Sequence, residues 1–130
     1  ARTEGATRDG STIDPAEVAR FEGIAKTWWD PKGPMAVLHK FNPVRLAFIR
    51  DLACARFGRD PKTIRSLEGL TLVDIGCGGG VLSEPLARLG AQVTGLDPAP
   101  TNVAVARSHT EAAGLSVDYR QETIEALVAE

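Results

Sequence analysis

The spacing of hydrophobic residues changes near residue 70 of this 130-residue chain. Before that point, apolar residues recur every three or four positions, which is typical of helices that bury one face. After it, short apolar runs alternate with helical spacing. This alternation predicts an α/β fold, with a parallel sheet and right-handed connections. We therefore divide the chain into a flexible tail (1–12), an N-terminal helical segment (13–68) and a sheet domain (69–130).

The first helix of the N-terminal segment has sequence signals at both ends. Asp14 is a good N-cap, Pro15 suits the first helical position, and Glu17 completes a capping box. Apolar residues at helical spacing then predict one face that runs to the tryptophan pair at 28–29. The following segment, residues 30–34, contains two prolines and a glycine and is predicted to be a loop.

A second helix is predicted to begin at Pro43, with Asn42 as its N-cap, because proline suits the first helical position. Gly58 is the expected C-terminal stop. Helical spacing places three apolar side chains of this helix on one stripe: Val44, Phe48 and Leu52.

The sheet domain opens with an apolar strand at residues 72–75, whose composition is typical of a parallel strand covered on both faces. A glycine loop follows at 76–80. The next helix is expected to begin near Leu82 or Ser83, because Pro85 is tolerated only in the first turn.

The rest of the domain repeats this strand and helix order. A second strand at 92–96 leads to Asp97, a helix covers 101–113, a third strand covers 117–120, and another helix starts at Glu122. Sheets that bind nucleotides usually have two halves that meet at the ligand crevice. We therefore predict that this chain is the first half of a longer domain and that it is inactive alone.

The glycine motif indicates a nucleotide-type site. Dinucleotide loops carry G-x-G-x-x-G, but Val81 stands at the last glycine position. The run from Asp74 to Gly80 instead resembles the first motif of class I S-adenosylmethionine methyltransferases. The carboxylate of Asp97 can accept two hydrogen bonds from a ribose diol. The alternatives are a nicotinamide-dependent dehydrogenase, a non-catalytic cofactor-binding module and a glycine turn without a ligand.

Composition excludes several other classes. The net charge is −2 and no basic run is present, which argues against a nucleic-acid-binding protein. Two cysteines, Cys54 and Cys77, form neither a zinc pattern nor a disulfide framework, and no metal site is predicted. Cys77 lies in the glycine loop, where we interpret it as a small packing residue rather than a nucleophile. A reducing compartment fits this composition.

Further stretches narrow the family. The tripeptide W-W-D at 28–30, the segment L-H-K-F-N-P-V-R-L at 38–46 and V-T-G-L-D at 93–97 accompany the glycine motif. Together they resemble the ubiquinone-biosynthesis O-methyltransferases over about residues 12–125. The resemblance implies a Rossmann-like class I fold, S-adenosyl-L-methionine as cofactor and a polyprenyl phenol or quinol as substrate. It leaves the oligomeric state open.

The resemblance also implies a location. A bacterial member is expected in the cytoplasm, with peripheral association with the inner membrane through parts absent from this chain as an option. A eukaryotic member is expected in the mitochondrial matrix.

The resemblance assigns cofactor contacts to individual residues. Gly76, with Gly78 in the same loop, lets the backbone approach the methionine moiety. Asp97 takes the ribose hydroxyls, and Glu122 follows the third strand, where related enzymes contact adenine. Arg45 is a permanent cation that can clamp the methionine carboxylate with paired hydrogen bonds. Without the resemblance, Arg45 would be interpreted as an exposed helix residue.

The catalytic group is not identified. His39 is a candidate that could orient the substrate or act as a base, since a phenol has a pKa near ~10. The alternative is a histidine that packs the helical segment. Trp28 and Trp29 either belong to the core or face an aromatic substrate. His109 is assigned no role.

Overall fold

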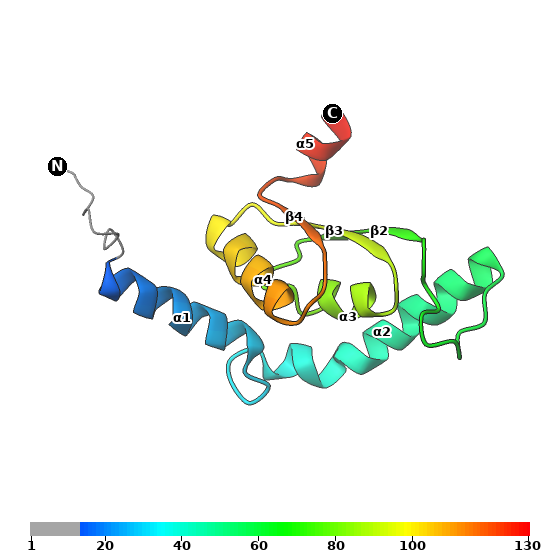
Figure 1. Ribbon diagram of the computed structural model, residues 1–130, viewed down its shortest axis with the longest axis horizontal. Helices are drawn as coiled ribbons and strands as arrows, with labels where there is room; N and C mark the ends of the chain where they lie inside the picture. The colour runs from blue at the N-terminus through cyan, green and yellow to red at the C-terminus, as the bar shows by residue number, and fades with distance from the viewer. Residues whose placement is uncertain (1–13) are drawn as a thin grey trace.

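The structure, a computed structural model, describes residues 14–130 (Figure 1). The tail predicted at 1–12 lies outside the described residues. In chain order the elements are α1 (Pro15–Trp29), α2 (Ala36–Phe57), β2 (Thr71–Ile75), α3 (Ser83–Arg88), β3 (Gln92–Leu96), α4 (Pro100–Ala112), β4 (Asp118–Arg120) and α5 (Ile124–Ala129). Two helices therefore precede an alternation of strands and helices, as the hydrophobic pattern predicts.

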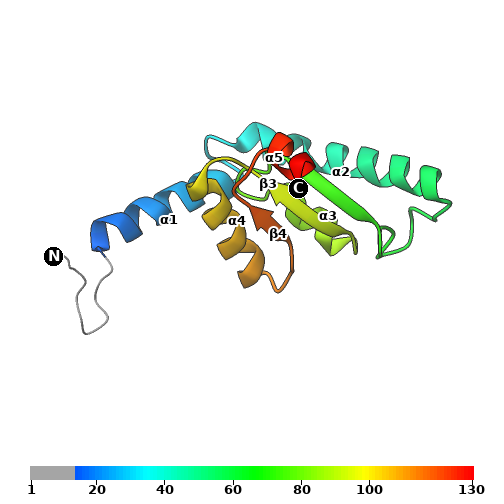
Figure 2. The same ribbon diagram turned by 90° about the horizontal axis from the view of Figure 1, so that it is seen from above.

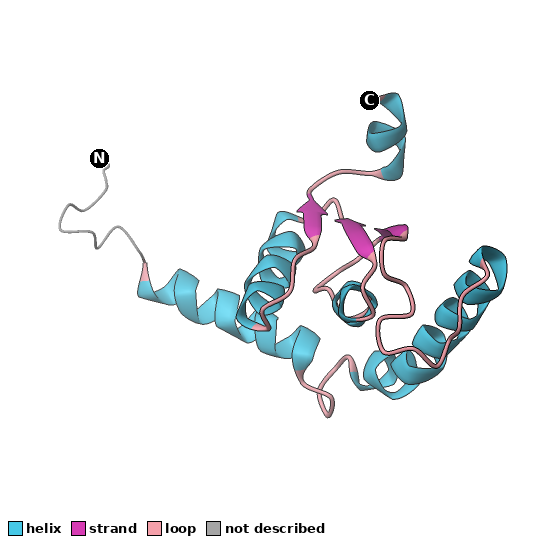
Figure 3. Ribbon diagram, turned by 45° about the vertical axis from the view of Figure 1, so that its right-hand side comes forward, coloured by secondary structure: helices cyan, strands magenta, loops and turns pink. Residues whose placement is uncertain are grey.

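The three strands form one parallel sheet in the order β2-β3-β4. Ile75 pairs with Leu96, and Gly95 pairs with Tyr119, so the carboxyl ends of the strands lie side by side. Helices α3 and α4 lie on the same side of the sheet (Figures 1 and 3). The predicted α/β class with parallel strands is confirmed, and the sheet is a partial one.

The opposite face of β2 is open within residues 14–130, as the view from above indicates (Figure 2). Val73 and Ile75 are 44% and 61% exposed on that face, whereas Leu72 is half-buried against the core. The prediction of a strand covered on both faces is therefore wrong for this chain. Successive side chains of a strand alternate between faces, and helices cover only one of them here.

The predicted start of α1 is confirmed, with one difference in the cap. Asp14 Oδ1 accepts a hydrogen bond from the Ala16 N–H at 2.9 Å, and Pro15 is the first helical residue. The N–H of Glu17 bonds to the backbone carbonyl of Asp14 instead of its side chain. The side-chain hydrogen bond of the N-cap therefore goes to Ala16, whereas a capping box requires it to go to Glu17.

Helix α2 begins seven residues before the predicted position. The Ala36 N–H bonds to the Gly33 carbonyl at 3.0 Å, so the helix follows directly from the preceding loop. Pro43 lies inside the helix, although it lacks the N–H of an interior residue. Asn42 lies inside the helix and does not cap it. Its Oδ1 has no hydrogen-bond partner within residues 14–130, and its side-chain amide donates to the Val81 carbonyl at 2.9 Å. Tertiary contacts here override a strong local signal.

The apolar stripe predicted on this helix is real but exposed. Val44, Phe48 and Leu52 are 67%, 66% and 60% exposed. The adjacent face, which includes Leu46 and Ile49, packs against the core. The helix ends as predicted, because Gly58 has a φ of +67° and its N–H caps the last turn.

The other boundaries differ from prediction by two residues at most, and the largest difference is at α5, which begins at Ile124 instead of Glu122. Helix α3 begins at Ser83, which places Pro85 in its first turn, as expected. Helix α4 and strand β4 each match their predicted ranges within one residue.

Two buried clusters attach the helices to the sheet. The first joins α2 and α3 to the sheet and includes Cys54, Leu67, Leu86, Ala87, Ala91 and Val93. The second joins the glycine loop, α4 and β4 and consists of Cys77, Val103, Ala106 and Tyr119. Because close-packed interiors hold side chains in fixed positions, these clusters position the loops at the carboxyl ends of the strands.

Candidate functional site

The candidate cofactor site lies where β2 and β3 end. There the glycine loop (residues 76–80) meets the turn that begins at Asp97. The N–H groups of Gly76 and Cys77 donate to the Leu96 carbonyl at 2.8 and 2.9 Å. The N–H of Gly78 donates to Asp97 Oδ2 at 3.0 Å, across 19 residues of sequence. The structure thus brings together the two segments that the motif indicates.

The glycines of the loop face different surroundings. Gly76 has a φ of +72°, and no atom lies within 4 Å of the position that a Cβ would take. A Cβ on Gly78 would lie 2.8 Å from Trp28 Cζ3, and one on Gly79 would lie 2.5 Å from Trp28 Cγ. Gly76 therefore faces free space that a ligand can enter, whereas the two later glycines face a tryptophan.

Asp97 is a buried carboxylate that accepts hydrogen bonds from the segments around it. Its side chain is paired not only with the loop but also with the turn that follows, because Oδ1 accepts from the Ala99 N–H at 2.9 Å and from the Asn102 amide at 3.4 Å. Two carboxylate oxygens offer about four lone-pair positions. Three intramolecular bonds therefore leave capacity for a further donor, such as a hydroxyl group.

A second carboxylate, Asp74, precedes the glycine loop. Its Oδ2 accepts a hydrogen bond from the Ser83 hydroxyl at 2.6 Å. Burial raises the pKa of Asp74, while the Ser83 hydrogen bond and the positive charge of Arg45 act in the opposite direction. Arg45 of α2 is exposed, and its positive charge acts on Asp74 just before the loop.

Glu122 lies just beyond β4, beside the same edge of the sheet. The Asp97 N–H bonds to the Arg120 carbonyl at 3.2 Å, which ties the end of β4 to the site. The Oε1 atom of Glu122 is buried and has no hydrogen-bond partner within residues 14–130. A buried acceptor without a donor is costly. This atom is therefore suited to receive a hydrogen bond from a ligand.

The structure places His39 at the junction of α1 and α2. Its Nε2 lies 2.8 Å from the Trp28 carbonyl oxygen, and its ring is tilted against the Trp29 ring at a centroid distance of 5.9 Å. These contacts are the ones expected of a histidine that packs two helices. A role with substrate stays a prediction.

Sequence reasoning missed a polar cluster behind the loop. The Glu84 side chain is only 4% exposed, and its Oε2 lies 2.7 Å from His109 Nδ1. The Thr110 hydroxyl donates to the same oxygen at 3.1 Å and lies 2.8 Å from the Tyr119 hydroxyl. Burial raises the pKa of Tyr119 to about 12. No spacing signal connects these four residues, because they come from three separate elements.

The Cys77 thiol is expected to be inert. Burial, followed by the negative charges of Asp74 and Asp97, raises the pKa of Cys77 to about 12. Only the thiolate is nucleophilic. Iodoacetamide at pH 8 should therefore leave Cys77 unmodified in the folded protein and alkylate it once the protein is unfolded, as checked by peptide mass spectrometry. Rapid labelling of folded protein at Cys77 would contradict this environment.

A cavity of about 1030 Å³ lies away from this site. Its lining includes Gln92 and Asp118, the first residues of β3 and β4, so it opens at the amino ends of the strands. Ligands of open α/β sheets bind at the carboxyl ends. We therefore do not assign this cavity to the cofactor.

Two further features are absent from residues 14–130. Within this range, no three His, Cys, Asp or Glu side chains are grouped so that they could hold a metal ion. None of the helices in the same range combines the length and the apolar character needed to cross a membrane.

Residues 72–130 match the family model described as a methyltransferase domain. The solved structure of the bifunctional kinase-methyltransferase WbdD has a similar fold, with a TM-score of 0.56 at 24% sequence identity. The match covers 78% of this chain and 20% of that chain. Fold, glycine loop and family model together define a class I methyltransferase domain, of which this chain contains a part.

Curated relatives identify the family more closely. The chain is 72% identical over 120 residues to the ubiquinone biosynthesis O-methyltransferase of Methylobacterium sp. (strain 4-46). This match covers 92% of this chain and 48% of the relative. It is 60% identical over 125 residues to that of Rhizobium leguminosarum bv. trifolii (strain WSM2304), with coverage of 96% and 48%. The chain belongs to this family and spans about half the length of the curated relatives it matches.

Proposed function

We propose that the protein is an S-adenosylmethionine-dependent O-methyltransferase that acts on a phenolic or quinol polyprenyl intermediate of ubiquinone biosynthesis. One observation carries the proposal. The free space beside Gly76 and the buried acceptor Asp97 belong to one hydrogen-bonded unit at the carboxyl ends of parallel strands. The names of the relatives support the substrate class.

The described residues fit the cofactor. The backbone at Gly76 would admit the methionine part, because no atom occupies the space next to its Cα. Asp97 would accept from a ribose hydroxyl, and the unpaired Oε1 of Glu122 would accept from the exocyclic amine of adenine. Arg45, exposed near the loop, would pair with the methionine carboxylate. These four contacts would orient the cofactor along the strand ends.

The reaction needs mainly positioning. When bound, the cofactor supplies a methyl group on a sulfonium centre, which is a good leaving group. The residues of the site would bind the cofactor and orient its methyl group. Alignment of two reactants can lower an activation barrier by about 7–11 kcal/mol. We assign no proton transfer to His39, whose described contacts are with the Trp28 carbonyl and the Trp29 ring.

The class of the substrate and the compartment follow from the relatives. The acceptor is a small molecule, and the bacterial sources of the relatives favour the cytoplasm over an organelle matrix. Peripheral membrane association stays a prediction.

Calorimetry and an activity assay test this function in the full-length protein. We expect S-adenosylhomocysteine to bind and NAD to give no heat of binding. We also expect methyl transfer to a short-chain demethylubiquinol analogue. Binding of S-adenosylhomocysteine without transfer to any phenol would indicate a non-catalytic module. Preferential binding of NAD would overturn the assignment in favour of a dehydrogenase.

Arg45→Lys should weaken binding of S-adenosylhomocysteine about tenfold, because lysine keeps the charge but loses the paired donors. Calorimetry measures this loss, and circular dichroism should show an unchanged fold. Arg56→Lys, on the same helix but next to the exposed Phe57, is the matched control and should bind normally. Equal affinities for the two variants would make Arg45 a surface residue.

A further inference from the structure

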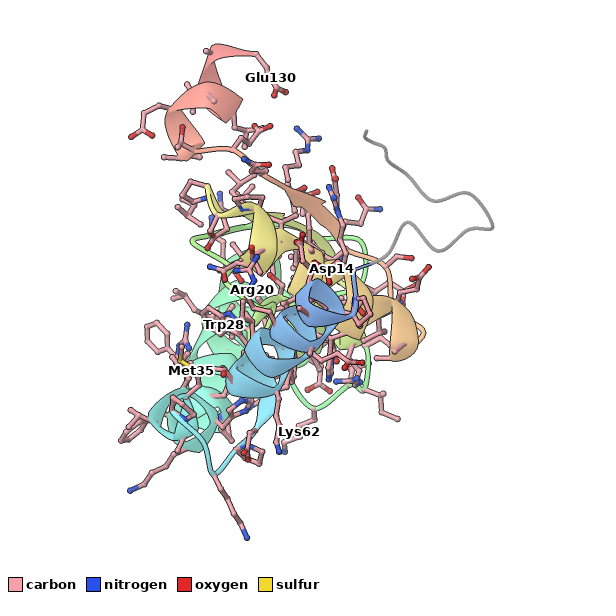
Figure 4. The ribbon with its side chains drawn as sticks, turned by 90° about the vertical axis from the view of Figure 1, so that its left-hand side faces the viewer. Asp14, Arg20, Trp28, Met35, Lys62 and Glu130 are labelled. Atoms are coloured by element: carbon pink, nitrogen blue, oxygen red, sulfur yellow. The ribbon has the colours of Figure 1, made fainter. Side chains whose placement is uncertain are left out.

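The C-terminal end of α1 packs against the glycine loop. Trp28 is labelled in Figure 4 on the part of α1 far from Asp14. It occupies the space that a Cβ at Gly78 or Gly79 would enter. The neighbouring Trp29 donates from its indole N–H to the Gly79 carbonyl at 3.0 Å. Two successive residues of one helix therefore contact the middle of the loop, 50 residues away in sequence.

Trp28 also contacts the other part of the site. Its indole N–H donates to Asn102 Oδ1 at 3.1 Å, and the amide of Asn102 donates to Asp97 Oδ1 at 3.4 Å. The same indole lies beside Gly78, whose N–H is bonded to Asp97 Oδ2. One side chain thus supports both the loop and the carboxylate.

Trp29 is itself held from behind. Its ring stacks on His109 in parallel planes with a centroid distance of 3.5 Å. His109 Nδ1 lies 2.7 Å from the buried Glu84 carboxylate on α3. A stacked ring that is anchored to a buried carboxylate has little freedom to rotate. The donor to Gly79 is therefore held in a single orientation.

We infer that Trp28 and Trp29 are positioning residues that set the glycine loop and Asp97 in the geometry required by the cofactor. The inference rests on the proposed function, since it assumes a cofactor at this loop. It divides the glycine motif into two roles. Gly76 leaves space for the ligand, whereas Gly78 and Gly79 leave space for Trp28.

The first test uses conservative variants of the full-length protein. Trp29→Phe keeps the stacked ring but removes the donor to Gly79, and Trp28→Phe removes the donor to Asn102. Each should raise the dissociation constant of S-adenosylhomocysteine about tenfold while the KM of the methyl acceptor stays within twofold. Phe57→Leu, at an exposed aromatic away from the loop, is the control and should change neither value.

The second test measures coupling between Trp28 and Gly78. Gly78→Ala would place its Cβ against the far ring of the indole, which phenylalanine lacks. The backbone strain at φ +55° is present in both backgrounds. The loss of cofactor affinity caused by Gly78→Ala should therefore be about tenfold smaller in the Trp28→Phe protein than in the natural one.

The outcomes separate this inference from the proposed function. If the natural protein fails to bind S-adenosylhomocysteine, the proposed function is wrong. If it binds but both tryptophan variants bind equally well, with a changed melting temperature only, the pair is merely structural. A raised acceptor KM with unchanged cofactor affinity would instead place the tryptophans against the substrate, and this too would overturn the inference.

Discussion

Gly76→Val should abolish binding of S-adenosylhomocysteine, with a loss of at least about 100-fold in affinity. The valine side chain would enter the free space beside Gly76 that we assign to the methionine moiety. A branched residue also disfavours the φ of +72° on which the turn depends. Calorimetry on the full-length variant measures the affinity, and thermal unfolding measures the strain separately.

Gly114→Val is the matched control for this change. Gly114 has a φ of +75° and open space around its Cβ position, as Gly76 does, but it follows α4 and lies away from the site. The two variants should lose similar stability, because the backbone strain is the same. Only the change at Gly76 should remove binding. A folded Gly76→Val protein with natural affinity would disprove the assignment of the loop.

Asp97→Ala should weaken cofactor binding by about 1.5–3 kcal/mol, the usual scale for a hydrogen bond to a charged group. The structure adds a second effect, because the same change leaves the N–H groups of Gly78 and Ala99 without their acceptor. We therefore also expect a lower free energy of unfolding, by about 1–3 kcal/mol for each unsatisfied group. Calorimetry and chemical denaturation measure the two effects.

Asp118→Ala is the control, since Asp118 is an exposed carboxylate at the amino end of β4 that pairs with Arg120. Surface ion pairs contribute little to stability, so this variant should bind and unfold almost normally. Asp97→Asn is a useful intermediate, because it keeps one acceptor oxygen. A dissociation constant unchanged by Asp97→Ala would remove this residue from the ribose site.

Several exposed apolar residues of the chain lie on faces of the sheet and of α2 that no other described element covers. Val73 and Ile75 lie on the sheet face without helices, and the stripe of Val44 and Phe48 lies on the outer side of α2. Exposed patches of this kind usually mark surfaces that contact something else. The spacing of these residues is correct for a strand and a helix, but spacing alone does not state which face is covered.

Local signals predicted the order of the elements and placed the glycine loop beside Asp97. Period and composition predicted β2, β3 and the glycine loop, because these features depend on neighbouring residues. Gly76 and Asp97 were placed together for the same reason, since the carboxyl ends of consecutive parallel strands are adjacent. The cap at Asp14 and the stop at Gly58 also depend only on short-range backbone geometry.

The tertiary structure alone decided the remaining features. The Asn42-Pro43 signal for a helix start was overridden, and the side-chain amide of Asn42 instead donates a hydrogen bond to the Val81 carbonyl on another segment. The hydrogen bond from Trp28 to Asn102 and the burial of Glu84 beside His109 join residues that are 74 and 25 positions apart. Sequence by itself determined where strands, helices and tight turns can form, since these follow from local dihedral and hydrogen-bond preferences. Which faces are buried and which glycines face protein depend on contacts between distant segments, and only the folded chain determines them.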